Sequence, residues 1–503
     1  MLYTCVILKS HDMKKIICYV FLLVSTIAVA QISNLAELAS GQIQVFSPIM
    51  ELDKKIYGYF MIVKLEDVDK NNEKFEYVLL DKNLNKVANG EFVDRKYKRL
   101  GARFLSPEKS GDHLIITKYY AQAYSPYVKF VTNRIINITK NEISPSFYYD
   151  NGEFVEGNRP EKKMLKTLKK IKTYEFPISI GGGYVLVENF KLQKNNNLPQ
   201  SLKAFNINKE QVWEYQFNPN KERVKKFFNV IDKEHFLFTT DNKTRVNTHT
   251  IHSLNPITGK LNFKYDIESA NSEWNHIYNI TALNDRFVIT GKISPYKRTG
   301  YEVKKAAGLF RIELDKSGKE LSKKYFLWHQ ANAFLPMNKK GKTKKGYRLY
   351  AKNYFVFNDG TISILTEKRK EGYDILFGAS KVKTTDFVIL NFDKDFNLID
   401  LKTIQKDLSK WSYSDYLYSQ KIKGGDGVVF FYNDYKKDPE TRKKNWILGI
   451  VTLINGEMTH EQIPMSSKEH FIAPYIAKEG FILLREFNKD SDYDEIRLER
   501  LNY

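Results

Sequence analysis

The feature that most constrains the fold is a strand–turn–strand unit that recurs along the chain. In its clearest copy, Gly308–Phe326, an apolar strand leads into the polar turn Asp315–Gly318 and a second strand. Such residues tolerate turn dihedral angles, and Asp and Asn side chains bond to their own backbone, so the pattern predicts a β-hairpin. Seven such turns recur at steps of 47 to 78 residues: Asp81–Asn83, Thr139–Asn141, Asn208–Glu210, Asn255–Gly259, Asp315–Gly318, Asp393–Asp395 and Asn455–Gly456.

Two further strand-like runs precede the turns, as Asn275–Leu283 and Asp285–Lys292 do before Asp315. Each unit therefore consists of strands a, b and c, the turn, and strand d, which is the pattern of a propeller blade. We predict an all-β β-propeller of about eight, alternatively seven, four-stranded blades. Two sandwiches or a β-solenoid are the competing repetitive folds. The last unit ends in Ile496–Tyr503 without a strand d, so we expect the mature N-terminus to supply that strand and close the ring, which removes exposed sheet edges.

The N-terminal segment has the parts of a secretory signal peptide over residues 13–30. A basic start leads into the apolar run Ile16–Ile27 and the small-residue cleavage site Ala28–Ala30. This run is short for a transmembrane span. We expect residues 1–12 to be an over-extended start, and residues 31–503 to be a single β-propeller domain exported by the Sec route to the periplasm or the exterior. The sequence has no lipobox, so we do not expect a lipoprotein.

Cysteine content and charge restrict the chemistry and the partners. The only cysteines, Cys5 and Cys18, lie in the segment that we expect to be removed, so the mature chain has no disulfide and no thiolate site. The formal net charge is +21, with 80 Lys and Arg against 59 Asp and Glu. This excess favours anionic partners such as acidic polysaccharide or glycolipid. The competing interpretation is a lysine-rich surface that serves only solubility. We expect the protein to be a monomer. Another envelope protein is an alternative partner, and we do not expect it to bind nucleic acid.

The basic residues concentrate in particular connections of the predicted blades. In an antiparallel four-stranded blade the b–c and d–a loops lie at one end and the a–b and c–d turns at the other. The long basic insertions fall in b–c and d–a positions, and one of them, near residues 160–173, has the apolar spacing of a short helix. We predict an anionic-ligand face there; the alternative is that each lysine is simply solvated. The predicted face comprises Lys162, Lys163, Lys166, Lys169, Lys170, Lys297, Arg298, Lys339, Lys340, Lys344, Lys345, Arg369, Lys437 and Lys443.

Catalytic and metal signatures are weak. The sequence lacks His-Glu-x-x-His, Gly-x-Ser-x-Gly and Walker A motifs, so we assign no catalytic or cofactor-binding residue. His249 and His252 lie in a predicted strand, where odd spacing sends side chains to opposite faces, so we interpret them as structural. No cofactor is expected. A calcium site is the one alternative, at Asp490, Asp492 and Asp494, whose spacing matches the start of a calcium loop but not its later positions.

By its repeated units behind a Sec signal, the chain resembles exported bacterial β-propellers of unknown function. The Ser-x-Asp-x-Gly-x-Thr-Trp boxes of sialidase-type propellers and the tryptophan docking motifs of quinone-binding dehydrogenases are absent. We therefore expect a binding or scaffold protein that recognises an anionic glycan, glycolipid or other polymer. One alternative is a cell-envelope carbohydrate-active hydrolase or lyase with its site in the central channel, which needs two carboxyl groups about 5–10 Å apart. The other is a structural or assembly partner.

Overall fold

The computed structural model describes residues 32–34, 41–98, 100–122, 128–150, 152–159, 176–188, 201–217, 222–230, 232–242, 248–267, 274–295, 306–338, 341–374, 379–410, 415–465, 470–488 and 494–502. This part of the chain is almost entirely β-strand, with two short 3-10 helices, η2 (Trp328–Ala333) and η3 (Lys423–Gly425). The predicted signal peptide and the predicted helical insertion near residues 160–173 lie outside the described residues.

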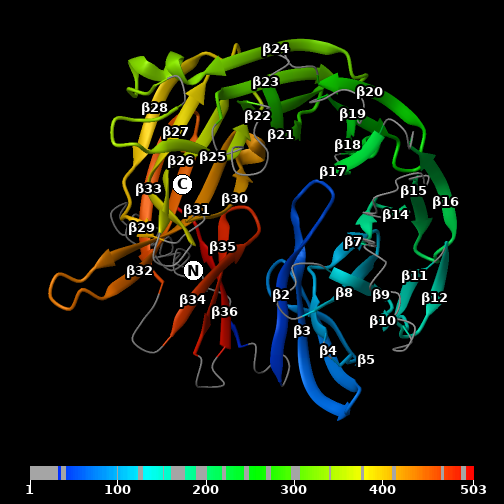
Figure 1. Cartoon of the computed structure of the whole chain (residues 1–503). Coiled ribbons are helices and arrows are strands. Elements are labelled where there is room, and N and C mark those ends of the chain that lie inside the picture. The colour runs from blue at the N-terminus through cyan, green and yellow to red at the C-terminus, as the bar shows by residue number, and fades with distance from the viewer. Residues whose placement is uncertain are drawn as a thin grey trace, which may run out of the picture.

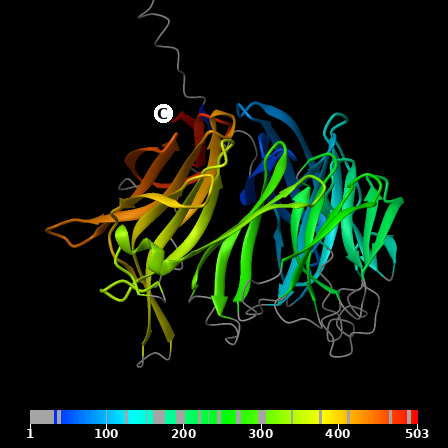
Figure 2. The same ribbon diagram turned by 90° about the horizontal axis from the view of Figure 1, so that it is seen from above.

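The described strands pair into eight separate antiparallel sheets that follow one another around a ring (Figure 1). The all-β propeller predicted from the repeat is confirmed. Figure 2 shows neighbouring blades side by side, with the β31–β32 hairpin projecting beyond the ring.

The first four blades carry the following strands: blade 1, β2 (Gln42–Met50), β3 (Ile56–Asp69), β4 (Asn72–Asp81) and β5 (Lys86–Arg95); blade 2, β6 (Leu100–Phe104), β7 (Glu108–Ser110), β8 (His113–Gln122), β9 (Val128–Asn137), β10 (Glu142–Ile143), β11 (Phe147–Asp150) and β12 (Glu153–Glu156); blade 3, β13 (Ile178–Ser179), β14 (Gly183–Glu188), β15 (Ser201–Asn206) and β16 (Gln211–Gln216); blade 4, β17 (Glu222–Val230), β18 (Phe236–Asn242), β19 (His249–Leu254) and β20 (Leu261–Ile267). Blade 2 departs from four strands because β6 and β7 both pair with β8 and together form its strand a.

The other four blades carry these strands: blade 5, β21 (Trp274–Ala282), β22 (Arg286–Pro295), β23 (Gly308–Asp315) and β24 (Glu320–Leu327); blade 6, β25 (Arg348–Val356), β26 (Ile362–Asp374), β27 (Ala379–Phe392), β28 (Leu398–Ile404) and the short β29 (Ser409–Lys410); blade 7, β30 (Tyr416–Ile422), β31 (Gly427–Lys437), β32 (Lys444–Ile454) and β33 (Glu457–Pro464); blade 8, β34 (Phe471–Ile476), β35 (Phe481–Phe487), β36 (Asp494–Arg500) and β1 (Ile32–Asn34).

Strand β1 closes the ring. It pairs antiparallel with β36, so that Ile32 lies opposite Arg497 and Asn34 opposite Glu495. The eighth unit thus receives its fourth strand from the N-terminal side of the chain, as the missing strand in the last repeat predicted. Pairing β36 in this way satisfies backbone groups that an open sheet edge would expose.

All seven predicted turns connect strand c to strand d or to its first segment. In the turn at Asp315, the carboxylate Oδ1 accepts the backbone N–H groups of Ser317 at 2.8 Å and Lys319 at 3.0 Å. Asp81, Asn206 and Asp393 accept the corresponding pairs. The third residue after each of these Asx residues has a positive φ, for example 87° at Gly318. The repeat in the sequence is therefore a repeated Asx turn with one left-handed position.

Neighbouring blades join through apolar clusters and through these turns. Phe and Tyr rings fill much of the space between blades, as expected for a propeller. Next to the turns, Trp213 Nε1 donates to the Pro256 carbonyl of blade 4 at 2.9 Å. Arg311 donates to the Lys394 carbonyl of blade 6 at 2.9 Å. At the ring closure, Lys478 Nζ donates to Asn83 Oδ1 at 2.6 Å. The turn that marks the repeat is thus also the point where each of these blades meets its neighbour.

Candidate functional site

The structure describes five of the fourteen residues of the predicted anionic-ligand face. The other nine lie outside the described residues: Lys162, Lys163, Lys166, Lys169, Lys170, Lys297, Arg298, Lys339 and Lys340. Four of the five are exposed, in b–c or d–a connections or at their edges. Lys344 and Lys345 lie between β24 and β25, and Lys437 and Lys443 lie at the tip of the β31–β32 hairpin.

Arg369 is the fifth, and its position differs from the expected surface loop. Strand β26 runs on to Asp374, so Arg369 lies inside a strand with only 8% of its surface exposed. Its guanidinium lies 5.1 Å from the centroid of the Tyr350 ring and 3.2 Å from Glu371 Oε1. The sequence placed it in a loop because Lys368, Arg369 and Lys370 form a charged run that hides the strand.

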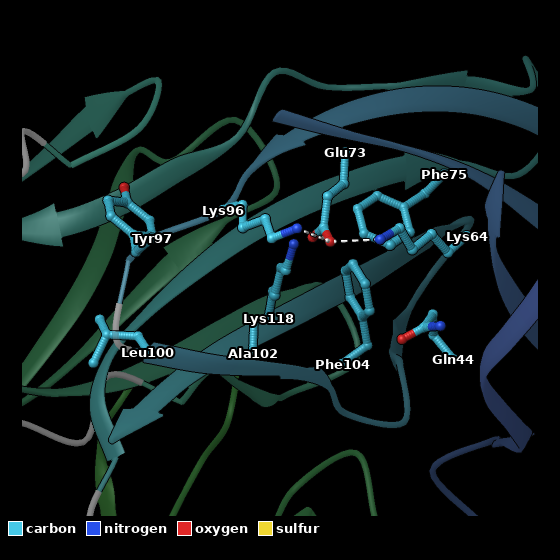
Figure 3. Close-up of a pocket in the computed structure, with 10 residues that line it drawn as sticks. All are labelled: Gln44, Lys64, Glu73, Phe75, Lys96, Tyr97, Leu100, Ala102, Phe104 and Lys118. Carbon is cyan, nitrogen blue, oxygen red and sulfur yellow. Dashed lines mark hydrogen bonds and ion pairs between the residues drawn. The ribbon is translucent and has the colours of Figure 1, made fainter. Parts of the chain in front are cut away.

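A cavity of about 150 Å³ lies between blades 1 and 2 (Figure 3). Its lining comes from β6, the middle of β8, the later part of β3, the start of β4, part of β2 and the d–a connection after β5. The residues of β3, β4 and this connection place it toward the b–c and d–a end of the blades. The lining consists of Gln44, Lys64, Glu73, Phe75, Lys96, Tyr97, Leu100, Ala102, Phe104 and Lys118.

Three lysines approach a single carboxylate in this cavity. Figure 3 shows the ammonium groups of Lys64, Lys96 and Lys118 pointing toward Glu73. Lys64 Nζ lies 2.9 Å from Glu73 Oε1, and Lys96 Nζ lies 3.8 Å from the same atom. Asp67 at the rim pairs with Lys64 at 2.7 Å and with Lys96 at 3.4 Å. Hydrogen bonds to Asp67 and Glu73 raise the pKa of Lys64, so its ammonium stays charged.

Lys118 is the deepest of the three cations. Its side chain is only 4% exposed, and its Nζ makes no hydrogen bond to any residue that the structure describes. The nearest acid is Asp94 at 3.6 Å, which already accepts two hydrogen bonds from the Arg134 guanidinium. Burial lowers the pKa of Lys118, and the attraction of Asp94 opposes that change. Lys118 is therefore a desolvated cation whose ion-pair partner among the described residues is Asp94 Oδ2, and it has hydrogen-bonding capacity left for a ligand.

Aromatic rings form the floor beneath these lysines. The Lys118 ammonium lies 4.6 Å from the centroid of Phe75 and 5.0 Å from that of Phe104. These two rings meet edge-on, with centroids 5.2 Å apart. Tyr97 packs edge-on against Tyr120 at 5.0 Å on the other side of the cavity. The rings hold the lysine in place from below, and its charge faces the cavity.

These lysines were not predicted from the sequence, because they lie in strands or at strand ends and not in the long basic loops. The sequence did contain a signal for one of these lysines, Lys118. Lys118 falls in the run Leu114–Tyr120, whose other members are apolar, aromatic or threonine. A lysine in such a run marks an unusual buried position. Pairing with Glu73, by contrast, depends on contacts between strands that no local pattern encodes.

The histidines serve the fold. His252 lies between Thr240 Oγ1 at 2.9 Å and the Tyr215 hydroxyl at 3.2 Å, and His249 packs against Tyr278. Within the described ranges no three His, Cys, Asp or Glu side chains gather to hold a metal ion. Of the alternative calcium site, Asp490 and Asp492 lie outside the described residues, and Asp494 forms an ion pair with Arg485 at 2.5 Å.

A comparison with protein families matches residues 13–502 to a family of unknown function, DUF6770. The chain belongs to this family. No curated protein matches its sequence. Over its described residues, no helix is both long and apolar enough to cross a membrane.

Solved structures with a similar arrangement show low identity and low TM-scores. A europium-containing methanol dehydrogenase matches at 9% identity and a TM-score of 0.41, covering 93% of this chain and 95% of that one. The WD40 domain of SCAP from fission yeast matches at 9% identity and 0.38, covering 93% and 97%. The β-propeller domain of the Trilobed protease from Pyrococcus furiosus matches at 11% identity and 0.33, covering 80% and 98%. No activity is inferred from these likenesses.

Proposed function

We propose that this protein is an exported binding protein that recognises an acidic glycan through the cavity between blades 1 and 2. The observation that carries the proposal is Lys118, whose buried ammonium lies beside the cavity and makes no hydrogen bond to a described residue. An acidic group of a ligand would supply the missing acceptor. Such a charge-assisted bond in a desolvated site is stronger than one on the surface.

The size of the cavity favours one ring-sized unit of a ligand. A cavity of about 150 Å³ is known to accommodate a single benzene molecule, and this one has a similar volume. Phe75 and Phe104 offer apolar surface to the carbon face of a sugar ring, while the lysines offer donors to its acidic substituent. We infer that a chain end or a single acidic sugar of a polysaccharide or glycolipid enters the cavity.

The net charge supports the same class of ligand. An excess of 21 positive charges raises the local concentration of a polyanion before the specific contacts form. The exposed Lys344, Lys345, Lys437 and Lys443 lie at the end of the ring that carries the cavity. These surface charges are screened within about 10 Å at moderate salt, whereas a buried ammonium is screened much less. The bound state should therefore keep part of its affinity at physiological salt.

A glycosidase is not favoured at this site. Hydrolysis of a glycosidic bond commonly uses two carboxyl groups that flank the bond. Among the ten residues that line the cavity, Glu73 is the single carboxylate, and lysines hold it. The geometry therefore supports binding in preference to hydrolysis.

The proposal is tested by titrating the protein with polygalacturonate, lipopolysaccharide, DNA and neutral dextran at low and at physiological salt. We expect binding to an acidic glycan that weakens with salt but persists, and no binding to dextran. Replacing Lys118 with Met should weaken that binding about tenfold, because one charge-assisted hydrogen bond is lost.

Lys140→Met is the matched control. Lys140 is exposed in the turn between β9 and β10, at the opposite end of the same blade, so it removes the same charge away from the cavity. If Lys118→Met and Lys140→Met lose affinity equally, binding depends on net charge alone, and the cavity is not the binding site. The absence of acidic-glycan binding at either salt concentration would refute the function.

A further inference from the structure

A second group of buried cations lies between blades 5 and 6. Three cations surround the ring of Tyr350 in β25. Lys292 Nζ of β22 lies 4.2 Å from the ring centroid, Lys352 Nζ of β25 lies 4.7 Å away, and Arg369 Cζ of β26 lies 5.1 Å away. Lys292 and Arg369 are each only 8% exposed, and the Lys352 side chain is 7% exposed. Three desolvated positive charges around one ring repel one another and need a compensating charge.

The acids that the structure describes around this ring compensate only part of its charge. Glu367 pairs with Lys352 at 3.0 Å and with Lys406 at 3.6 Å, and Glu371 lies 3.2 Å from Arg369. Among the described residues, Lys292 forms no ion pair, and its ammonium lies over the Tyr350 ring. The contact with Glu371 is made by the Arg369 Nε, and it lacks the geometry of a hydrogen bond.

The neighbouring network around Lys406 shows how this protein compensates the charge of a buried lysine with acids. Lys406 is completely buried, and Asp415 lies 2.5 Å from its ammonium. Thr384 donates a further hydrogen bond to Asp415 at 3.1 Å. Acids therefore lie beside one deeply buried lysine, whereas no described acid forms an ion pair with Lys292. Burial, together with repulsion from Lys352 and Arg369, lowers the pKa of Lys292 to about 8.

We propose that Lys292, Lys352 and Arg369 form a second anion-binding site, which takes a small oxyanion such as a sulfate, phosphate or carboxylate group. The oxyanion would accept hydrogen bonds from the Lys292 ammonium and the Arg369 guanidinium and would neutralise charge that the described acids do not pair. The site lies near the b–c end of β22 and β26, on the other side of the ring from the cavity between blades 1 and 2. It stands independently of the function proposed for that cavity.

Inorganic sulfate is the probe, because its charge does not change between pH 7 and 9. The thermal midpoint of the full chain is measured as sulfate replaces chloride at constant ionic strength. Sulfate also stabilises proteins non-specifically, so the informative quantity is the difference between variants. We expect sulfate to raise the thermal midpoint most in the wild type and in the control Lys319→Met. In Lys292→Met the apparent sulfate affinity derived from this rise should be about tenfold weaker. Lys319 is exposed in the c–d turn of the same blade.

A variant at the first cavity separates the two proposals. Lys118→Met should keep the full sulfate response, because the second site is intact. A polygalacturonate arm then distinguishes a free oxyanion from the acidic group of a polymer. A response to polygalacturonate but not to sulfate, lost in Lys292→Met, assigns the site to an acid carried on a polymer. If the wild type and Lys292→Met respond equally to sulfate, and also respond equally to polygalacturonate, the proposal is overturned.

The pH dependence of sulfate affinity distinguishes a lysine that binds the anion from one that only supports the fold. The groups facing Lys292 are Tyr350 and Lys352 from β25 and Arg369 from β26, with Glu367 and Glu371 behind them. Sulfate affinity of the wild type should fall between pH 7 and 9 as Lys292 loses its proton. Lys292→Arg keeps its charge and should lose less affinity over that range. Equal pH dependence of the two proteins would contradict a role for the Lys292 charge.

Discussion

The uncompensated charge of Lys292 predicts that removing it stabilises the protein. A fall in the pKa of Lys292 from its ordinary 10.5 to about 8 corresponds to about 3 kcal/mol, because each pKa unit represents about 1.4 kcal/mol. The contact of the ammonium with Tyr350 offsets this cost by about 1 kcal/mol. Lys292→Met keeps the stem and loses the charge, so it should raise the free energy of unfolding by about 2 kcal/mol at pH 7.

The sign of the pH dependence follows from the same values. Because the pKa of Lys292 is lower in the folded state, the unfolded chain binds the extra proton between pH 8 and 10.5, and the wild type gains stability as the pH rises through that window. Below pH 8 the penalty is constant. The advantage of Lys292→Met should therefore be largest at pH 7 and nearly gone at pH 10.5.

Urea unfolding of both proteins at several pH values, in chloride buffer without sulfate or phosphate, measures the difference. Other lysines and tyrosines titrate in the same window, and taking the difference between the two proteins removes their contribution. A destabilised Lys292→Met at pH 7, or a difference that does not change with pH, would refute the view that this charge is uncompensated. The former result would instead mean that Lys292 has a favourable partner in the folded protein.

Three further predictions concern the cavity and the joints between blades. Asp94→Asn leaves Arg134 and Lys118 buried without their shared acid and should cost about 3 kcal/mol or more in urea unfolding; a cost near zero would show that the acid is not needed. Trp213→Phe removes the bond to the Pro256 carbonyl and should cost about 1–2 kcal/mol, so an unchanged unfolding midpoint would contradict a role for this bond at the blade 3–4 joint. Lys478→Met removes the bond to Asn83 at the ring closure and should speed proteolysis of the native protein, while unchanged proteolysis would mean that β1 pairing alone holds the closure.

The architecture could be predicted from the sequence because its signal is local and repeated. Each Asx residue of the c–d turns bonds to backbone groups two and four residues away, so the turn appears in the sequence as a compact motif. The missing fourth strand of the last unit predicted that the N-terminal side would supply it, and β1 does so. The split strand a of blade 2 was not predicted, because β6 and β7 are short and interrupted by Pro107.

The candidate sites were harder to predict because they depend on contacts between blades. Lys118 and Asp94 lie on different blades and meet only when the ring is assembled. Arg369 was assigned to a loop from its charged neighbours, whereas β26 carries it toward Tyr350 in the interior. Charge runs locate surface loops well, but buried cations are found in strands, where the surrounding residues are apolar and the partners are remote in sequence.

The most direct test of the account is a crystal structure of the protein with an acidic oligosaccharide bound. The account predicts that an acidic group of the sugar lies about 2.7–2.9 Å from Lys118 Nζ, the distance of a charge-assisted hydrogen bond, with the sugar ring above Phe75 and Phe104. A bound oligosaccharide that occupies another surface, with the cavity between blades 1 and 2 empty of it, would contradict the account.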